Sequence, residues 1–371
     1  MRQLNKNHYG IQKRILCFIL LVVSTYAQDN RLRLVRADVL ENITINGESM
    51  QYLKGNVQFK KGEMVMNCNW ARFNKKTEKG FLFENVSMVK NEQNLTCDSL
   101  FVDSPNNIMI AYSNTHVWDT TYSLIADTLH YFSELDSGSA NGNAILVQDK
   151  QTIKSNTIEY VELPEVDGVS YAARGDVIIT EEERIATCGE AIYDRENGKT
   201  VMKINPKIID NQQTIAGNEI YLSYNDDILD KVFIPSDAHV THPINGFREW
   251  IEIIDDDSIN YSDPVNFSDD MTGSALHGFF VDGKLDSMRL EGMATTLYHI
   301  FEDSIYQGNN KASGDTIQMK FKDNDLETIF ISGGSEGTYT PDSSDAQMEG
   351  PIKYKSEDIE YNRSDESTDL H

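Results

Sequence analysis

Two short motifs have residue types and spacings that could support catalysis or phosphate binding. Residues 333–337 read G-x-S-x-G, the pattern of a nucleophilic serine, and residues 278–284 read G-x-x-x-x-G-K, the pattern of a phosphate-binding loop. The serine motif needs a following helix, which residues 338–345 (TYTPDSSD) do not favour. The phosphate motif needs Ser or Thr where Leu285 stands. We therefore expect a turn at the first motif and a hairpin at the second.

Candidate metal ligands are also present. His239 and His242 are three residues apart, a spacing that on a β-strand directs the two side chains to opposite faces. The acidic runs at 255–257 and 269–270 lack the spaced ligands and the glycine of a calcium loop, so solvated acidic loops explain them better. Paired carboxylates occur throughout a chain with 59 acidic residues, so no single pair indicates catalysis. We expect no catalytic residue, no metal and no cofactor.

The composition is that of an acidic, folded and exported protein. The 371 residues carry a formal net charge of −26, which argues against nucleic acid as a partner because phosphate recognition needs a basic surface. Residues 1–27 combine four basic residues, an apolar run at 15–23 and small residues near the end, which predicts a signal peptide. The apolar run is shorter than the about 20 residues that span a bilayer. Removing the four basic residues brings the charge to −30.

An internal repeat sets the elements that would position any site. The repeated unit has eight residues, with apolar or small residues at positions 1, 3, 6 and 8 and Asp, Asn or Gly near its centre. The clearest copies begin at Met66, Leu95, Leu124, Ile153, Ala186 and Ile215. The first four starts are each 29 residues apart, a constant register that indicates a repeat protein.

Each copy predicts two short strands joined at a corner. Positions 1 and 3 share a face, as do positions 6 and 8, but the odd step from 3 to 6 would place the two pairs on opposite faces of an unbroken strand. A bulge or corner restores the phase, and the central residues are of types that tolerate unusual backbone. They are Asn69, Asp98, Asp127, Asn156, Gly189 and Asn218. A strand opened by Gly-Asn-Val or a relative precedes most copies, as at 55–57 and 175–177.

The C-terminal half follows the same logic with tighter hairpins, and no segment has a convincing helical period. Residues 244–270 interrupt the rhythm with acidic runs and Pro264, so we expect a long loop or insertion there. The predicted organisation is a signal peptide at 1–27, a first repeat region at 31–163, a second at 164–361 with an acidic insertion at 244–270, and a frayed polar tail at 362–371. The fold class is all-β.

Cysteines occupy position 3 of three copies, where other copies carry Ala126 or Ser155. This slot favours a small buried side chain, and Cys serves as a small hydrophobe. An exported protein could join Cys68 to Cys97, but nothing in the sequence shows that their Cβ atoms face each other. The redox state of Cys68, Cys97 and Cys188 stays open.

Apolar residues recur at equivalent positions of the copies and are the candidate groove lining. They are Val57, Phe59, Met64, Met66, Val86, Met88, Leu95, Leu124, Ile153, Ile178, Ile215 and Ile220. One interpretation is that they fill a core between two β layers. The other is that an open pair of sheets leaves part of this face for lipid chains, since a ~14-carbon chain at ~0.8 kcal/mol per CH₂ could gain on the order of 10 kcal/mol.

An export signal, Gly-Asn-Val, a strand and the octamer, recurring about every 29 residues, resemble the OstA/LptA family of lipopolysaccharide-transport proteins. The match is carried by residues 55–57 with 68–73, 126–131, and 175–177 with 188–193, and it extends from about residue 31 to 361. The resemblance implies a repetitive twisted β-jellyroll, open along one side, that shields lipid A acyl chains. It also implies a periplasmic, non-catalytic carrier or bridge, with outer-membrane association as an alternative location.

The resemblance further implies three partners: lipopolysaccharide, other Lpt-type jellyrolls stacked by their edge strands, and an outer-membrane translocon. The chain has about twice the repeats of a minimal bridge protein, and its negative charge would leave headgroups in solvent or bridged by divalent cations. Two other functions stay open. A right-handed β-helix enzyme acting on polysaccharide would need stacked carboxylates with a basic residue, whereas the basic residues here are scattered. A structural surface repeat protein would have a fully dry core.

Overall fold

The computed structural model describes residues 31–371, except 46, 164–165, 211, 255–256, 323–324, 343–349 and 363–366. The predicted signal peptide at 1–27 lies outside the described residues. The described chain forms 25 strands and one short 3₁₀ helix, which confirms the all-β class. This part of the chain holds no helix with the length and apolarity needed to cross a membrane.

The first strands form a continuous meander. They are β1 (Arg33–Arg36), β2 (Val39–Ile45), β3 (Glu48–Lys61), β4 (Met64–Asn74), β5 (Lys79–Lys90), β6 (Gln93–Asp103), η1 (Ser104–Asn106), β7 (Ile108–Trp118), β8 (Tyr122–Phe132), β9 (Ser137–Gln148), β10 (Gln151–Leu163), β11 (Val166–Glu181) and β12 (Arg184–Asp194). From β3 to β12, each strand pairs antiparallel with the next. This order differs from the parallel coils of a β-helix, so that alternative fold is wrong for the described chain.

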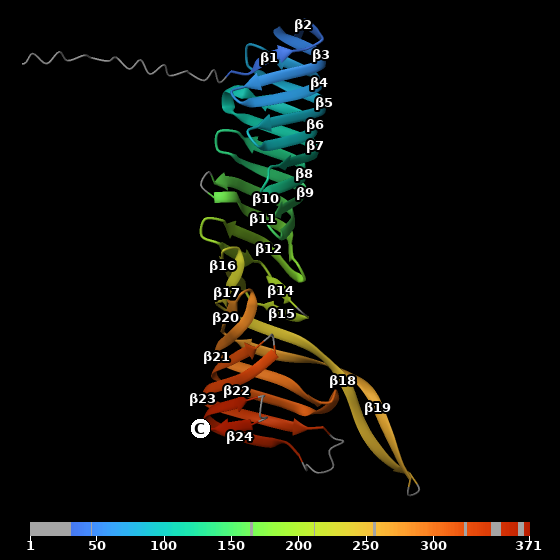
Figure 1. The fold of residues 1–371 in the computed structure, drawn as a ribbon, viewed down its shortest axis with the longest axis vertical. Helices are drawn as coiled ribbons and strands as arrows, with labels where there is room; N and C mark the ends of the chain where they lie inside the picture. Colours follow the sequence, from blue (N-terminus) through green and yellow to red (C-terminus); the bar gives the residue numbers. More distant parts are fainter. Residues whose placement is uncertain are drawn as a thin grey trace, which may run out of the picture.

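The remaining strands continue the stack. They are β13 (Lys199–Lys203), β14 (Lys207–Asp210), β15 (Gln213–Ala216), β16 (Glu219–Asn225), β17 (Ile228–Ile234), β18 (Ala238–Ile254), β19 (Asp257–Gly273), β20 (Ala275–Val281), β21 (Lys284–Glu302), β22 (Ile305–Lys322), β23 (Asp325–Pro341), β24 (Ile352–Asn362) and β25 (Ser367–Leu370). Figure 1 shows a tall, twisted stack with β1 and β2 at one end and β24 near the other. The pairing passes from β10 to β11 without a break, and the division into two repeat regions stays a prediction.

Long strands bend once, at a corner that divides them between two layers. The pairing of β3 with β4 shifts register between Lys54 and Val57, and the pairing of β8 with β9 shifts between Ile125 and Thr128. We call the layer that contains the first half of β3 and the second half of β4 layer A. The layer that contains the other two halves is layer B. The meander therefore builds both layers together, one hairpin at a time.

The octamer positions face the space between these layers. In the copy that starts at Leu124, the residues at positions 1, 3, 6 and 8 are Leu124, Ala126, Leu129 and Tyr131, and all four are buried. The same four positions are buried in the copies that start at Met66, Leu95, Ile153 and Ala186. Both pairs can lie on one side only if the strand bends between positions 3 and 6, so the predicted corner is confirmed.

The backbone that makes the corner differs from the expected one. Left-handed φ angles lie on the Gly-Asn pair of the preceding strand, as at Gly142 (+78°) and Asn143 (+48°), and not on the octamer's central Asp127. Asp127 instead accepts a hydrogen bond from Asn143 Nδ2 at 2.9 Å. A Cβ atom on Gly142 would lie 2.4 Å from Asp127 Oδ2. The central residue therefore supports its neighbour's turn, and the Asn114–Asp98 contact of 2.8 Å repeats this arrangement.

The expected loop at 244–270 is a long hairpin. β18 and β19 pair over 17 positions, from Ala238 opposite Gly273 to Ile254 opposite Asp257. Figure 1 shows this hairpin leaving the stack as an arm. Its base is held by the stacked rings of Phe267 and His299, whose centroids are 4.3 Å apart.

Three smaller expectations can also be compared with the structure. The motif at 333–337 holds the corner of β23, where Gly333 and Gly334 have positive φ angles. The motif at 278–284 is the β20–β21 hairpin, as expected, with Asp282 and Gly283 in the turn. The tail was expected to fray, but residues 367–370 form β25 and pair with β24.

Candidate functional site

The space between the two layers is apolar along the stack. One cluster of buried hydrophobic side chains runs from Leu32 to Ile359. Eleven of the twelve candidate groove residues belong to it, and each is at most 8% exposed. They are Val57, Phe59, Met64, Met66, Val86, Met88, Leu95, Leu124, Ile153, Ile215 and Ile220. The layers therefore meet in a closed core in this structure.

Ile178 is the one candidate that the structure places elsewhere. Its side chain is 40% exposed, whereas the neighbouring Val177 and Ile179 are buried in the core. Successive residues of a strand point to opposite faces, so Ile178 lies on the outer face of β11. The alternation of Val177 with Ile179 carried the correct phase.

The two layers are joined covalently at the corners and by side-chain contacts along the opposite edge, which we call the mouth. At the mouth, the strand-joining turns of layer A face those of layer B. Lys61 at the β3–β4 turn donates from Nζ to the Ser104 carbonyl of layer A at 2.8 Å and also bonds Asn107 Oδ1. Burial lowers the pKa of Lys61, and nearby carboxylates such as Glu134 oppose this effect. The first crossing of the mouth is therefore a partly buried ammonium group.

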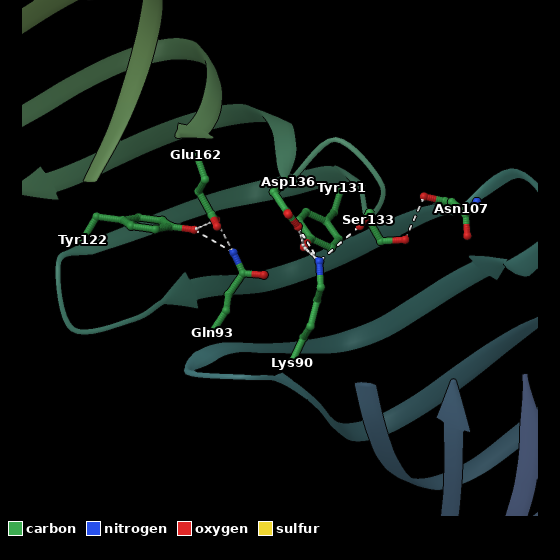
Figure 2. Close-up of polar contacts among 8 residues, drawn as sticks. All are labelled: Lys90, Gln93, Asn107, Tyr122, Tyr131, Ser133, Asp136 and Glu162. Atoms are coloured by element: carbon green, nitrogen blue, oxygen red, sulfur yellow. Dashed lines mark hydrogen bonds and ion pairs between the residues drawn. The ribbon is translucent and has the colours of Figure 1, made fainter. Parts of the chain in front are cut away.

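The second crossing repeats the first one repeat later. Lys90 Nζ donates to the Ser133 carbonyl at 3.1 Å and to Tyr131 Oη at 3.4 Å, and it forms an ion pair with Asp136. Figure 2 shows these groups converging between the two turns, with Ser133 also bonded to Asn107 of the neighbouring repeat. The lysine thus links the β5–β6 turn of layer B to the β8–β9 turn of layer A.

A buried carboxylate completes this part of the mouth. Tyr122 donates from its hydroxyl to Glu162 Oε1 at 2.5 Å, and Gln93 donates from Nε2 to the Tyr122 hydroxyl at 2.8 Å and to Glu162. Burial raises the pKa of Glu162, and the hydrogen bond from Tyr122 opposes this rise. The carboxylate is therefore held by two donors but shielded from much of the solvent.

Further along, the crossings change in kind. The side-chain amide of Gln148 accepts from the Val169 N–H at 2.6 Å and donates to the Val169 carbonyl at 3.3 Å. Arg195 Nη1 then bonds Asp149 at 2.7 Å and Asp227 at 2.9 Å. Amide and guanidinium groups thus replace the lysines towards the middle of the stack.

The three described cysteines offer no nucleophile. Cys68, Cys97 and Cys188 are buried and free. Burial raises their pKa values to about 11, 12 and 11 respectively, so each is a neutral thiol near pH 7. Cys68 lies on β4 and Cys97 on β6, with β5 between them. Two strand spacings of about 4.8 Å exceed the ~7 Å limit between Cα atoms for a disulfide.

Chemistry by metal ions finds no ready site in the described part of the chain. There, no three His, Cys, Asp or Glu side chains converge as ligands. His239 instead contacts Asp270, with Nε2 and Oδ2 2.6 Å apart. The groups that the structure brings together are a continuous apolar interior and a polar mouth, an arrangement suited to enclosing an apolar chain.

The mouth residues were missed in the sequence, although a signal was present. Lys61 and Lys90 are 29 residues apart, as are Ser104 and Ser133. A search for polar residues that keep the 29-residue register would have found both pairs. Their contact partners lie more than 40 residues away, so the pairing itself required the fold.

Comparisons with known proteins agree with the repeat. The OstA-like protein family matches residues 29–92 and 75–218. The chain is also similar to LptH of Pseudomonas aeruginosa, described as the LptA-homologous periplasmic component of the lipopolysaccharide transport device. That likeness covers 37% of this chain and 80% of the LptH chain at 14% identity, with a TM-score of 0.19. No curated protein sequence matches at a significant level. Since the family matches span more than half of the 371 residues, the chain belongs to the OstA-like protein family.

Proposed function

We propose that this protein is a periplasmic, non-catalytic carrier or bridge that shields the acyl chains of lipopolysaccharide on their way to the outer membrane. The observation that carries the proposal is the unbroken apolar interior between the two layers, bounded on one side by corners and on the other by the mouth. Family membership and the expected signal peptide support the class of cargo and the compartment.

The proposal requires the layers to separate, because the candidate groove residues now form a closed core. Separation would break mouth hydrogen bonds that contribute about 0.5–1.5 kcal/mol each. Enclosing a ~14-carbon acyl chain contributes on the order of 10 kcal/mol before ordering costs. One chain therefore outweighs the contacts of two or three repeats. The methionines among the core residues suit this exchange, since their side chains adapt to irregular contacts.

The charge of the protein places the headgroup outside. A formal charge of −26 repels lipid A phosphates, so attraction must come from the acyl chains while the sugars and phosphates stay in solvent or are bridged by divalent cations. Exposed strand edges at the ends of the stack, such as β2, offer sites where other Lpt-type jellyrolls could add and extend the bridge towards an outer-membrane translocon.

Site-specific photocrosslinking in a Gram-negative periplasm tests the proposal. Benzoylphenylalanine replaces Leu124, which faces the interior, or the adjacent Ile125, which is 45% exposed. Leu146 and Val147 form a second matched pair on the next strand. We expect lipopolysaccharide adducts at the two inward positions and none at the outward ones. Thermal melts of each variant establish that it is folded.

Equal labelling of both faces, or folded inward variants without adducts, would contradict the carrier. A folded and lipid-free protein would favour a structural or purely bridging role instead.

A further inference from the structure

The mouth has an opening at the middle of the stack. Two clefts of about 500 and 540 Å³ lie there, and both are lined by Glu181, Glu182, Arg184, Gly283 and Lys284. These shared residues belong to the β11–β12 turn of layer B and the β20–β21 turn of layer A. The two clefts therefore form one opening between the layers, and each has the volume of a small-molecule site.

The floor of this opening joins the apolar interior. Leu229 and Tyr193 line one cleft and are part of the buried core. Tyr224, Phe280 and Phe321 line the clefts as partly buried side chains packed against that core. An apolar chain that passes between the two turns would meet the core without crossing the outer face of either layer.

The rim of the opening is polar and rich in acid. Arg184 donates to Asp210 Oδ2 from Nε at 3.0 Å and from Nη2 at 2.8 Å, and Lys150 pairs with Glu182 at 3.1 Å. Further rim acids outnumber the basic groups; they are Asp149, Glu181, Glu183, Asp226, Asp227 and Asp282. Moving a phosphate or carboxylate headgroup past this rim would be unfavourable, whereas an uncharged chain meets no such repulsion.

We infer that this central opening is a side entrance, through which an acyl chain of an amphiphile enters the interior while its headgroup stays outside the acidic rim. The inference rests on the proposed function and adds the place of entry. It contrasts with the N-terminal part of the mouth, where Lys61 and Lys90 link the facing turns directly. Entry at the centre leaves these contacts in place until the chain has been taken up.

A reversible crosslink across the opening tests this entrance. Glu183 and Lys284 are exposed and line the same cleft from opposite layers, so Glu183→Cys with Lys284→Cys can be joined by a reducible bismaleimide. Cys17 is replaced by Ser, and the three buried thiols with raised pKa values stay unreactive. The matched control joins Lys61→Cys to Asn107→Cys across the N-terminal mouth. Uptake of dansyl-labelled undecanoic acid is followed by its blue-shifted fluorescence.

We expect the central crosslink to slow uptake by roughly tenfold or more, as a closed lid does, and reduction to restore the rate. The control crosslink should leave uptake close to that of the uncrosslinked chain. Unchanged uptake with the central crosslink, or slowing only with the N-terminal one, would overturn the side entrance. Absence of uptake in the uncrosslinked chain would instead count against acyl-chain binding itself, so the two failures are distinguishable.

Discussion

Among single residues, Glu162 links the state of the mouth to pH. Burial raises its pKa in the folded chain above the value of about 4.3 expected when unfolded. The folded chain therefore binds this proton more tightly than the unfolded chain. Stability from the neutral carboxyl is fully present below the unfolded pKa and is lost as pH rises through the folded pKa. The Tyr122 and Gln93 donors reduce this loss without removing its cause.

Replacing Glu162 with Gln should therefore stabilise the protein at pH 8 and have little effect near pH 4. The amide oxygen of Glu162→Gln keeps an acceptor for both donors and removes the buried charge. The difference in Tm between variant and parent, measured across this pH range, should grow with pH. The exposed Glu63→Gln serves as control and should show no such trend. A pH-independent difference for Glu162→Gln would show that its ionisation is not coupled to folding.

The Lys90–Asp136 pair should contribute measurably to stability because its side chains are 23% and 44% exposed. A double-mutant cycle with Lys90→Met and Asp136→Asn should give a coupling energy of about 1 kcal/mol in urea unfolding. The same cycle on the more exposed Lys150–Glu182 pair should give less than about 0.5 kcal/mol. Equal coupling at both pairs would argue that the mouth gains nothing from partial burial.

Among the elements, the corner is the feature on which the two layers depend. Gly142 adopts a left-handed φ directly against Asp127, so Gly142→Ala should destabilise the fold by about 2–3 kcal/mol through backbone strain and the clash together. Gly334 has a similar φ (+67°), but a Cβ atom added there would meet no other atom within 4 Å, so Gly334→Ala should cost only about 1 kcal/mol. Chemical denaturation compares the two. Equal losses would mean that the Asp127 contact does not restrict the corner.

The outer part of the β18–β19 arm should be dispensable for folding. A two-stranded ribbon is marginal on its own in water, and this one is attached to the stack at its base. Replacing residues 249–262 with Asn-Gly would join Arg248 to Asp263, which are already paired across the hairpin. We expect Tm to change by less than about 3 °C. A larger fall would show that the outer arm stabilises the stack.

Much of this architecture could be predicted from the sequence because it is set by local patterns. The octamer alternation identified the inward faces, and the Gly-Asn pairs marked the corners. The hairpin at 244–270 was missed because Pro and Asp disfavour strands, yet Pro264 is tolerated in an arm whose strands have free edges. The mouth could not be predicted, since it joins residues such as Gln93 and Glu162 that only the stacking of layers brings together.

At the scale of the whole molecule, a meander that bends at every repeat produces one long apolar interior with a single separable edge. The corners hold one side of the layers covalently, while hydrogen bonds and ion pairs hold the other. Such an asymmetric enclosure can widen at the mouth without breaking the backbone pairing within either layer. The same construction continues through the C-terminal strands, so the enclosure extends beyond the repeats that match the family.

Native mass spectrometry of the full-length product, released gently from a Gram-negative periplasm, tests the central claim most directly. The account predicts adducts with the mass of lipopolysaccharide, and lipid A fragments when they are dissociated. The Met66→Asp, Ile153→Asp variant, which places charge in the interior, should lose the adducts, and the outward Val65→Asp, Lys154→Asp variant should retain them. A folded parent protein that is free of lipid under these conditions would contradict the account.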